Sequence, residues 1–125
     1  MVDPVALAIA GIDHVQVAAP AGREEDARAF YGGLLGLEEL SKPAALAARG
    51  GCWFRAGAQE LHVGVEEGFM PARKAHPGLV ADDLDSLAGQ LRDAGHDVVF
   101  DDAIPGARRF HVADPFGNRL EIRQA

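Results

Sequence analysis

Short runs of alternating apolar and polar residues, punctuated by glycine and proline, dominate the first half of the chain. Residues 12–18 (IDHVQVA) alternate up to Pro20 and predict a strand. Residues 23–35 instead carry apolar side chains at helical spacing, have acidic residues at their start, and stop at Gly36, which predicts a helix. Three more short strands are predicted after it, at residues 37–40, 51–55 and 59–66.

The second half of the chain repeats this order. Residues 78–81 predict a strand, and leucines at helical spacing predict a helix that Asp82 or Asp83 caps and Gly95 ends. Three strands follow, at residues 97–101, 108–113 and 119–123, with a DPFGN turn at 114–118. Each half is therefore predicted to have the element order β-α-β-β-β, and the repeat has a period of about 60 residues. Two copies of such a repeat are too few to form a solenoid.

This repeat predicts the fold class and the organisation of the chain. We expect an α+β fold in which two paired βαβββ modules, at about residues 11–66 and 76–123, form curved mixed sheets that enclose a cavity. Residues 67–75 connect the modules. The length of 125 residues fits this single domain. Alternation through Val5, Leu7 and Ile9 predicts an extended segment, which either lengthens the first strand or contacts a partner.

Charge and cysteine content narrow the function classes. The formal net charge of −7 argues against binding to nucleic acid or to anionic membrane surfaces. The single cysteine, Cys52, excludes an intrachain disulfide and a CxxC motif, and it is expected to be a small core residue. The first ten residues lack the basic start of a signal peptide and are too short to span a membrane, so we expect a cytoplasmic protein.

Histidines and one glutamate occupy equivalent positions of the two halves. His14 and His76 stand at the first strand of each half, and His62 and Glu121 stand in the last strand. Any single histidine is more often a surface or core residue, but all four positions recur together. Imidazole and carboxylate ligands suit a divalent zinc, nickel, iron, manganese or cobalt ion, and two histidines with one carboxylate also suit non-haem iron.

Four segments resemble a known family: GIDHVQVA, ARAFYGGLLGLEEL, DDLDSLAGQLRDAGHDV and DPFGNRLEI. They are similar to the vicinal oxygen chelate (VOC) superfamily, which includes glyoxalase I, bleomycin-resistance proteins, fosfomycin-resistance thiol transferases, methylmalonyl-CoA epimerase and extradiol dioxygenases. The resemblance covers Gly11 to Arg123 and implies paired βαβββ modules. It also implies His14, His76 and Glu121 as metal ligands, with His62 at a fourth position that some branches of the family fill.

Residues that alternate with core positions are candidates to bind a substrate. Trp53 and Arg55, and likewise Arg109 and His111, either face the cavity or lie on its rim. An aromatic ring with arginines suits an anionic or conjugated small molecule. Gln16, on the same strand face as His14, is placed to hydrogen-bond a ligand or a water.

The resemblance implies a glyoxalase-like, metal-dependent enzyme of the lyase or isomerase type that acts on a small oxygen-chelating substrate. Glu121 would then serve as metal ligand and proton acceptor, with Glu60 as an alternative base. The alternatives are an extradiol-type dioxygenase that uses iron, a thiol transferase, and a metal-free antibiotic- or metabolite-binding protein of the bleomycin-resistance type. The family implies a homodimer, and the modules pair either within one chain or across two.

Overall fold

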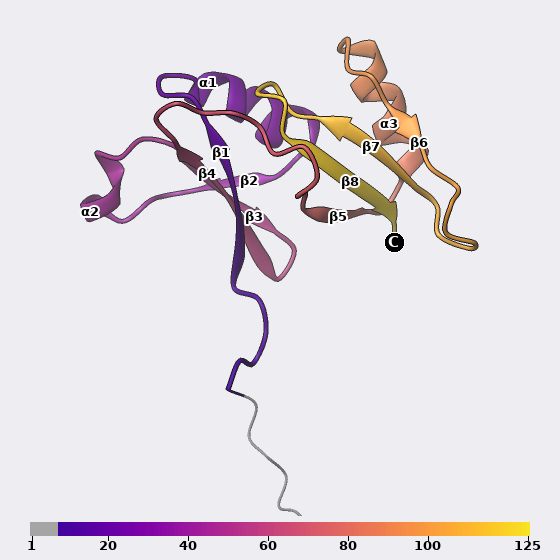
Figure 1. Ribbon diagram of the computed structural model, residues 1–125, viewed down its shortest axis with the longest axis horizontal. Helices are drawn as coiled ribbons and strands as arrows, with labels where there is room; N and C mark the ends of the chain where they lie inside the picture. Colours follow the sequence, from indigo (N-terminus) through magenta and orange to yellow (C-terminus); the bar gives the residue numbers. More distant parts are fainter. Residues whose placement is uncertain (1–7) are drawn as a thin grey trace, which may run out of the picture.

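Two four-stranded mixed sheets form the frame of the molecule (Figure 1). The computed structural model describes residues 8–125, so the predicted extension through Val5 and Leu7 lies outside the described residues. The first sheet has the order β1-β4-β3-β2, and its strands are β1 (His14–Ala19), β2 (Glu38–Leu40), β3 (Cys52–Ala56) and β4 (Gln59–Val65). The second has the order β5-β8-β7-β6, and its strands are β5 (Gly78–Ala81), β6 (Val99–Phe100), β7 (Arg109–Ala113) and β8 (Arg119–Gln124).

The two sheets have the same topology, which confirms the predicted βαβββ modules. In each, the first strand lies parallel to the last, as β1 does to β4 and β5 does to β8. The other neighbours are antiparallel. The last strand of each module is therefore central, and β1 and β5 are edge strands.

The helices depart from the prediction in two places. The helix predicted over residues 23–35 is divided into α1 (Glu24–Ala27) and a wider π-helical segment, η1 (Arg28–Leu34). The short helix α2 (Ala44–Ala47) was not predicted, because four residues are too few to show a helical period. Helix α3 (Leu84–Asp93) forms as predicted. None of the helices among residues 8–125 has the length and apolar character needed to cross a bilayer.

The ends of α3 follow from local sequence. Asp83 is the N-cap, and its carboxylate accepts a hydrogen bond from the Ser86 amide at 3.1 Å. At the other end, Gly95 adopts a positive φ of 88° and the His96 amide donates to the Leu91 carbonyl at 2.9 Å. This pair of features is the Schellman motif that glycine favours.

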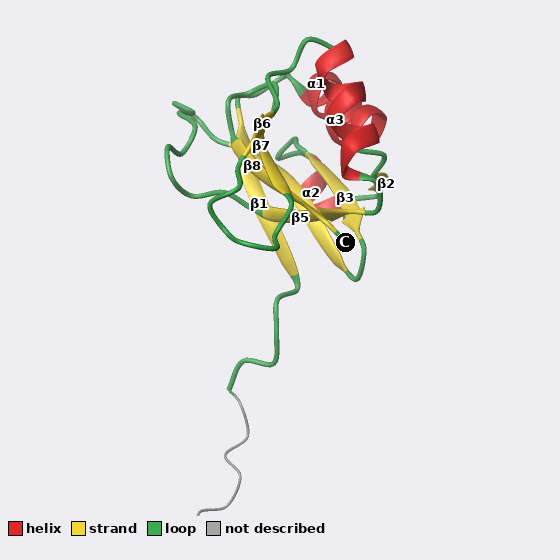
Figure 2. Ribbon diagram, turned by 90° about the vertical axis from the view of Figure 1, so that its right-hand side faces the viewer, coloured by secondary structure: helices red, strands yellow, loops and turns green. Residues whose placement is uncertain are grey.

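The core lies between the sheets and the helices α1, η1 and α3, which cover the same side of the molecule (Figure 2). Its largest fully buried side chains come from both modules and are Tyr31, Phe30, Phe54, Phe110, Leu61, Leu84, Leu91, Leu120 and Ile122. Alternation along each strand therefore sends polar side chains to the opposite face of each sheet.

The DPFGN turn joins the two modules. Asp114 accepts hydrogen bonds from the amides of Phe116 and Asn118, both at 2.9 Å, and from the Tyr31 hydroxyl at 2.6 Å. The Asn118 side-chain amide donates to the Ala18 carbonyl of β1 at 2.7 Å. The turn between β7 and β8 is thus bonded to η1 and to β1, which positions one sheet against the other.

Candidate functional site

Three aromatic rings stack across adjacent strands on the polar face of the first sheet. Trp53 of β3 lies over His62 of β4 with ring centroids 4.0 Å apart and planes 3° from parallel. His14 of β1 lies against His62 at 4.2 Å and 18°. The stack leaves His62 only 5% exposed, whereas His14 remains open to solvent.

Carboxylates hold both histidines of this stack. The Nε2 atom of His62 lies 2.9 Å from Glu60 Oε1. The Nδ1 atom of His14 lies 2.9 Å from Asp13 Oδ2, which leaves Nε2 of His14 without a partner among the hydrogen bonds of the described residues. Carboxylate contacts of this kind fix the ring orientation of metal-binding histidines.

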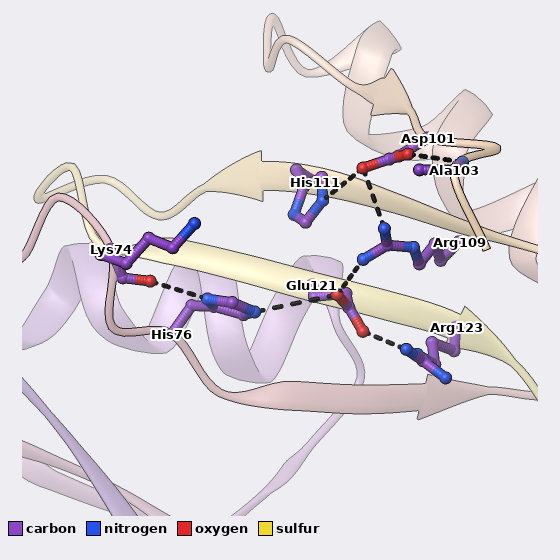
Figure 3. A network of polar contacts seen from close by, with 8 residues as sticks. All are labelled: Lys74, His76, Asp101, Ala103, Arg109, His111, Glu121 and Arg123. Atoms are coloured by element: carbon purple, nitrogen blue, oxygen red, sulfur yellow. Dashed lines mark hydrogen bonds and ion pairs between the residues drawn. The ribbon is translucent and has the colours of Figure 1, made fainter.

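A second polar network is centred on Glu121 of β8 (Figure 3). Both of its carboxylate oxygens meet a guanidinium: Arg123 Nε donates to Oε2 at 2.6 Å, and Arg109 donates to Oε1. Arg109 also donates to Asp101 at 3.0 Å. In the β7–β8 register, His111 lies directly opposite Glu121.

His76 faces Glu121 across a short gap. Its Nδ1 atom lies 2.9 Å from the Lys74 carbonyl, which can only accept a hydrogen bond, so Nδ1 carries a proton. Its Nε2 atom lies 3.7 Å from Glu121 Oε1, the oxygen that also accepts from Arg109. With Nε2 protonated this contact is an ion pair, and with Nε2 unprotonated the nitrogen and the carboxylate suit a cation between them.

The charges around Glu121 keep it ionised. The Arg123 guanidinium, and to a lesser degree that of Arg109, holds the pKa of the Glu121 carboxyl below its ordinary value although burial opposes this. The pKa of Asp101 is also lowered, chiefly because its carboxylate accepts a hydrogen bond from the Ala103 amide. An ionised Glu121 suits a metal ligand and is a weaker base than an ordinary carboxylate.

The structure therefore brings the four predicted ligands together as two pairs. His14 and His62 share the first sheet, and His76 and Glu121 belong to the second. Among residues 8–125, no group of three or more histidine, cysteine or acidic side chains is close enough to hold a metal ion. Within a single chain, the two pairs do not form one group.

The predicted substrate-binding residues lie beside these pairs. Trp53 belongs to the aromatic stack, and Arg109 and His111 belong to the network around Glu121. Gln16 lines a cleft of about 320 Å³ together with His76. Arg55 is exposed and lies opposite Glu60 in the β3–β4 register.

A larger cleft lies away from the histidines. It has a volume of about 860 Å³ and is bounded by the edge strands β1 and β5, the end of η1 and the start of α3. No histidine and none of the predicted substrate-binding residues lines it, but Glu60, the alternative base, does. Because the predicted metal ligands lie elsewhere, we assign no role in the site to this cleft.

Two participants in the site were missed by sequence reasoning. Arg123 shares a strand face with Glu121 at a spacing of two residues, so the alternation of β8 could have indicated it. Asp101 had no such signal, because the register of β6 against β7 brings it to Arg109: it lies just beyond β6, and its amide donates to the Arg109 carbonyl at 3.1 Å.

The paired modules, with polar faces that carry histidine and glutamate, define a class of protein. The family model of the Glyoxalase/Bleomycin resistance protein/Dioxygenase superfamily matches residues 11–122, and the chain belongs to this family. This confirms the resemblance to the VOC superfamily. A comparison with curated proteins gives no significant match.

Solved structures support the same assignment. A protein from Bacillus anthracis assigned to the glyoxalase family is 52% identical, with a TM-score of 0.92, over 96% of this chain and 98% of that one. A lactoylglutathione lyase from Agrobacterium tumefaciens is 21% identical, with a TM-score of 0.72, over 95% and 96% of the two chains. A fosfomycin resistance protein from Listeria monocytogenes is 12% identical, with a TM-score of 0.73, over 94% of each chain. The last two show the fold alone.

Proposed function

We propose that this protein is a glyoxalase-like, metal-dependent enzyme of the lyase or isomerase type. Its substrate is a small molecule with two adjacent oxygens, and its cofactor is one divalent ion held by His14, His62, His76 and Glu121. The observation that carries the proposal is the 3.7 Å separation between His76 Nε2 and Glu121 Oε1, a ring nitrogen and a carboxylate oxygen that face each other.

The side chains present fit a metal ion. His14 and His76, at equivalent positions of the two modules, each direct Nδ1 to an oxygen acceptor at 2.9 Å. Each therefore leaves Nε2 for a ligand, which is the usual arrangement of metal-binding histidines. Three imidazoles and one carboxylate suit zinc, nickel, cobalt, iron or manganese.

A homodimer would complete the site. The two pairs belong to different sheets of one chain, and the first strand of each sheet is an edge strand. Both edge strands expose apolar side chains, with Val15 of β1 37% exposed and Val80 of β5 70% exposed. We infer that β1 of one chain meets β5 of a second, which would unite the first pair of one subunit with the second pair of its partner.

Different side chains would have different roles in the proposed reaction. A bound divalent ion acts as a Lewis acid that stabilises negative charge on a chelated oxygen. Arg109 and Arg123 keep Glu121 ionised, so its carboxylate suits a metal ligand; to accept a proton from the carbon beside that oxygen it would first have to release one of these guanidiniums. Gln16, Trp53 and Arg55 are the residues of the first sheet that would contact the substrate.

Metal content and proton exchange test this function. Protein without a histidine tag, loaded with each candidate metal and desalted, should retain about one ion per chain, and the ion should raise the melting temperature. His14→Ala and His76→Ala should both abolish retention, whereas the control His96→Gln, which lies outside both pairs, should not. The loaded protein should also catalyse deuterium exchange at the α-carbon of a suitable α-hydroxycarbonyl compound, followed by NMR.

The same measurements distinguish the alternative. A protein that retains no metal, and whose melting temperature does not change with zinc, nickel, iron, manganese or cobalt, is a metal-free binding protein instead. Retention that is unchanged by either histidine substitution would show that the ion binds elsewhere.

A further inference from the structure

Arg109 and His111 project from β7 onto the face that carries His76 and Glu121 (Figure 3). Both ring nitrogens of His111, and the Nε atom of Arg109, are buried and have no hydrogen-bond partner among the described residues. A buried polar group without a partner is costly, so such atoms normally bind a water, an ion or a ligand. Three of them on two neighbouring side chains beside Glu121 are therefore candidates to bind a ligand.

Asp101 satisfies these atoms only in part. Its Oδ2 oxygen lies 3.4 Å from His111 Nε2, an ion pair when the ring is protonated but a long distance for a hydrogen bond, and it already accepts a bond from Arg109 at 3.0 Å. Its other oxygen accepts from the Ala103 amide at 2.9 Å. Asp101 therefore holds Arg109 and borders His111, while both keep unused donor capacity toward the face of Glu121.

The charge balance indicates what kind of group would bind. Two guanidiniums, those of Arg109 and Arg123, face two carboxylates, those of Asp101 and Glu121, so this network is neutral with its histidines neutral. A divalent ion bound at Glu121 would give this network two excess positive charges, although the net charge of the chain is −7. Both the free donors and this excess favour an anionic oxygen ligand.

We propose that Arg109 and His111 form a subsite for a substrate carboxylate that is separate from the two chelating oxygens. This inference rests on the proposed function and names its substrate class: a small dianion with adjacent oxygens at one end and a second carboxylate at the other, as in a 2-oxodicarboxylate. Both terminal nitrogens of Arg109 already donate, to Glu121 and to Asp101, so a substrate carboxylate would bind through Nε and a remaining hydrogen of a terminal nitrogen.

A matched pair of ligands tests the subsite. 2-Oxoglutarate and 2-oxopentanoate have the same number of carbons and the same keto-carboxylate end, and only the first carries the distal carboxylate. Calorimetric titration of the zinc-loaded protein should show 2-oxoglutarate bound at least about tenfold more tightly than 2-oxopentanoate. His111→Phe and Arg109→Met should each remove most of this preference.

The control is Arg108→Gln, which removes a neighbouring positive charge that pairs instead with the exposed Asp85 and lies over the Phe100 ring. This variant should keep the tenfold preference. His111→Gln, which retains a donor, should keep part of it. Arg109→Met removes a contact of Glu121 and could fail to fold for that reason. In that case the subsite is tested by comparing the preference for 2-oxoglutarate in His111→Phe with that in His111→Gln.

The outcomes separate this proposal from the metal site. Equal affinity of the wild-type protein for both ligands, or a preference that survives His111→Phe, overturns the subsite even if zinc is retained. If no metal is retained, the same titrations are made on the metal-free protein. A preference for 2-oxoglutarate that depends on His111 would then support the subsite while the proposed function fails.

Discussion

At the scale of single residues, Tyr31 shows how one buried polar group stabilises the fold. It is the only tyrosine of the chain, it is fully buried, and its hydroxyl donates to Asp114 at 2.6 Å. Burial, and secondly the negative charge of Asp114, raises the pKa of this phenol far above its ordinary value of about 10. The folded protein therefore keeps Tyr31 protonated in alkaline solution.

The first prediction concerns alkaline unfolding. Below about pH 10 the Tyr31 contribution to the free energy of unfolding is constant, and above it this contribution falls because only the unfolded chain releases the proton. In a pH titration, tyrosinate absorbance should therefore rise together with loss of the circular dichroism signal. A tyrosinate band near pH 10 in a protein that remains folded would contradict this prediction.

A second prediction compares two glycines that both have positive φ. At Gly51, φ is 87° and an added Cβ would lie 2.1 Å from the Val63 carbonyl oxygen, whereas at Gly57, φ is 62° and the space is open. Gly51→Ala should lower the free energy of unfolding by at least about 3 kcal/mol. Gly57→Ala should cost only about 1 kcal/mol. Urea denaturation measures both, and similar costs would show that β3 and β4 are not so closely apposed.

At the scale of elements, the end signals of α3 lead to a third prediction. Asp83→Ala should reduce the free energy of unfolding by about 1 kcal/mol, because the Ser86 amide loses its side-chain acceptor. Asp82→Ala is the matched control, since the Asp82 contact with Gln124 uses the main-chain carbonyl and survives the substitution. Chemical denaturation should distinguish the two, and equal stability of the variants would argue against Asp83 as the cap.

The elements also show what sequence pattern can and cannot predict. The longer strands, such as β4, β7 and β8, follow from alternation, because a half-buried strand must present one apolar face. The short strands β2, β5 and β6 contain no buried residue. The same alternation placed His62 opposite Leu61 and Arg109 opposite Phe110, so the polar faces were predictable. The π-helical segment and α2 were not, since their hydrogen-bond pattern and brevity leave no period in the sequence.

The contacts of the site depend on register, which sequence alone does not contain. The stack of Trp53, His62 and His14 exists because β4 lies between β3 and β1 in one register. The histidine positions were predictable from the repeat, but the partners that orient them were not. Asp101 reaches Arg109 because the register of β6 and β7 places the two residues opposite each other.

At the scale of the whole molecule, the repeat explains the separation of the candidate ligands into two pairs. Each module supplies one pair on its own sheet, and its edge strand remains available for pairing with a second chain. The central claim is that the two pairs bind the same ion when two chains associate. The alternative is that all four ligands bind one ion within a single chain. Mixing of subunits distinguishes a shared site from a site within one chain.

The most direct test mixes two inactive variants and measures retained zinc. One variant, His14→Ala with His62→Ala, lacks the first pair, and the other, His76→Ala with Glu121→Gln, lacks the second. Neither should retain zinc alone. After subunit exchange at equal amounts, half of the dimers are mixed and each holds one intact site, so retention should recover to about a quarter of the wild-type value.

The single variants His14→Ala and His62→Ala, mixed with each other, are the control, because every site they form lacks a ligand of the first pair. That mixture should show no recovery. Recovery to about a quarter of the wild-type retention in the first mixture alone is the result that the account predicts. Wild-type protein that retains zinc, with no recovery in a first mixture whose subunits have been shown to exchange, would contradict a site shared between chains.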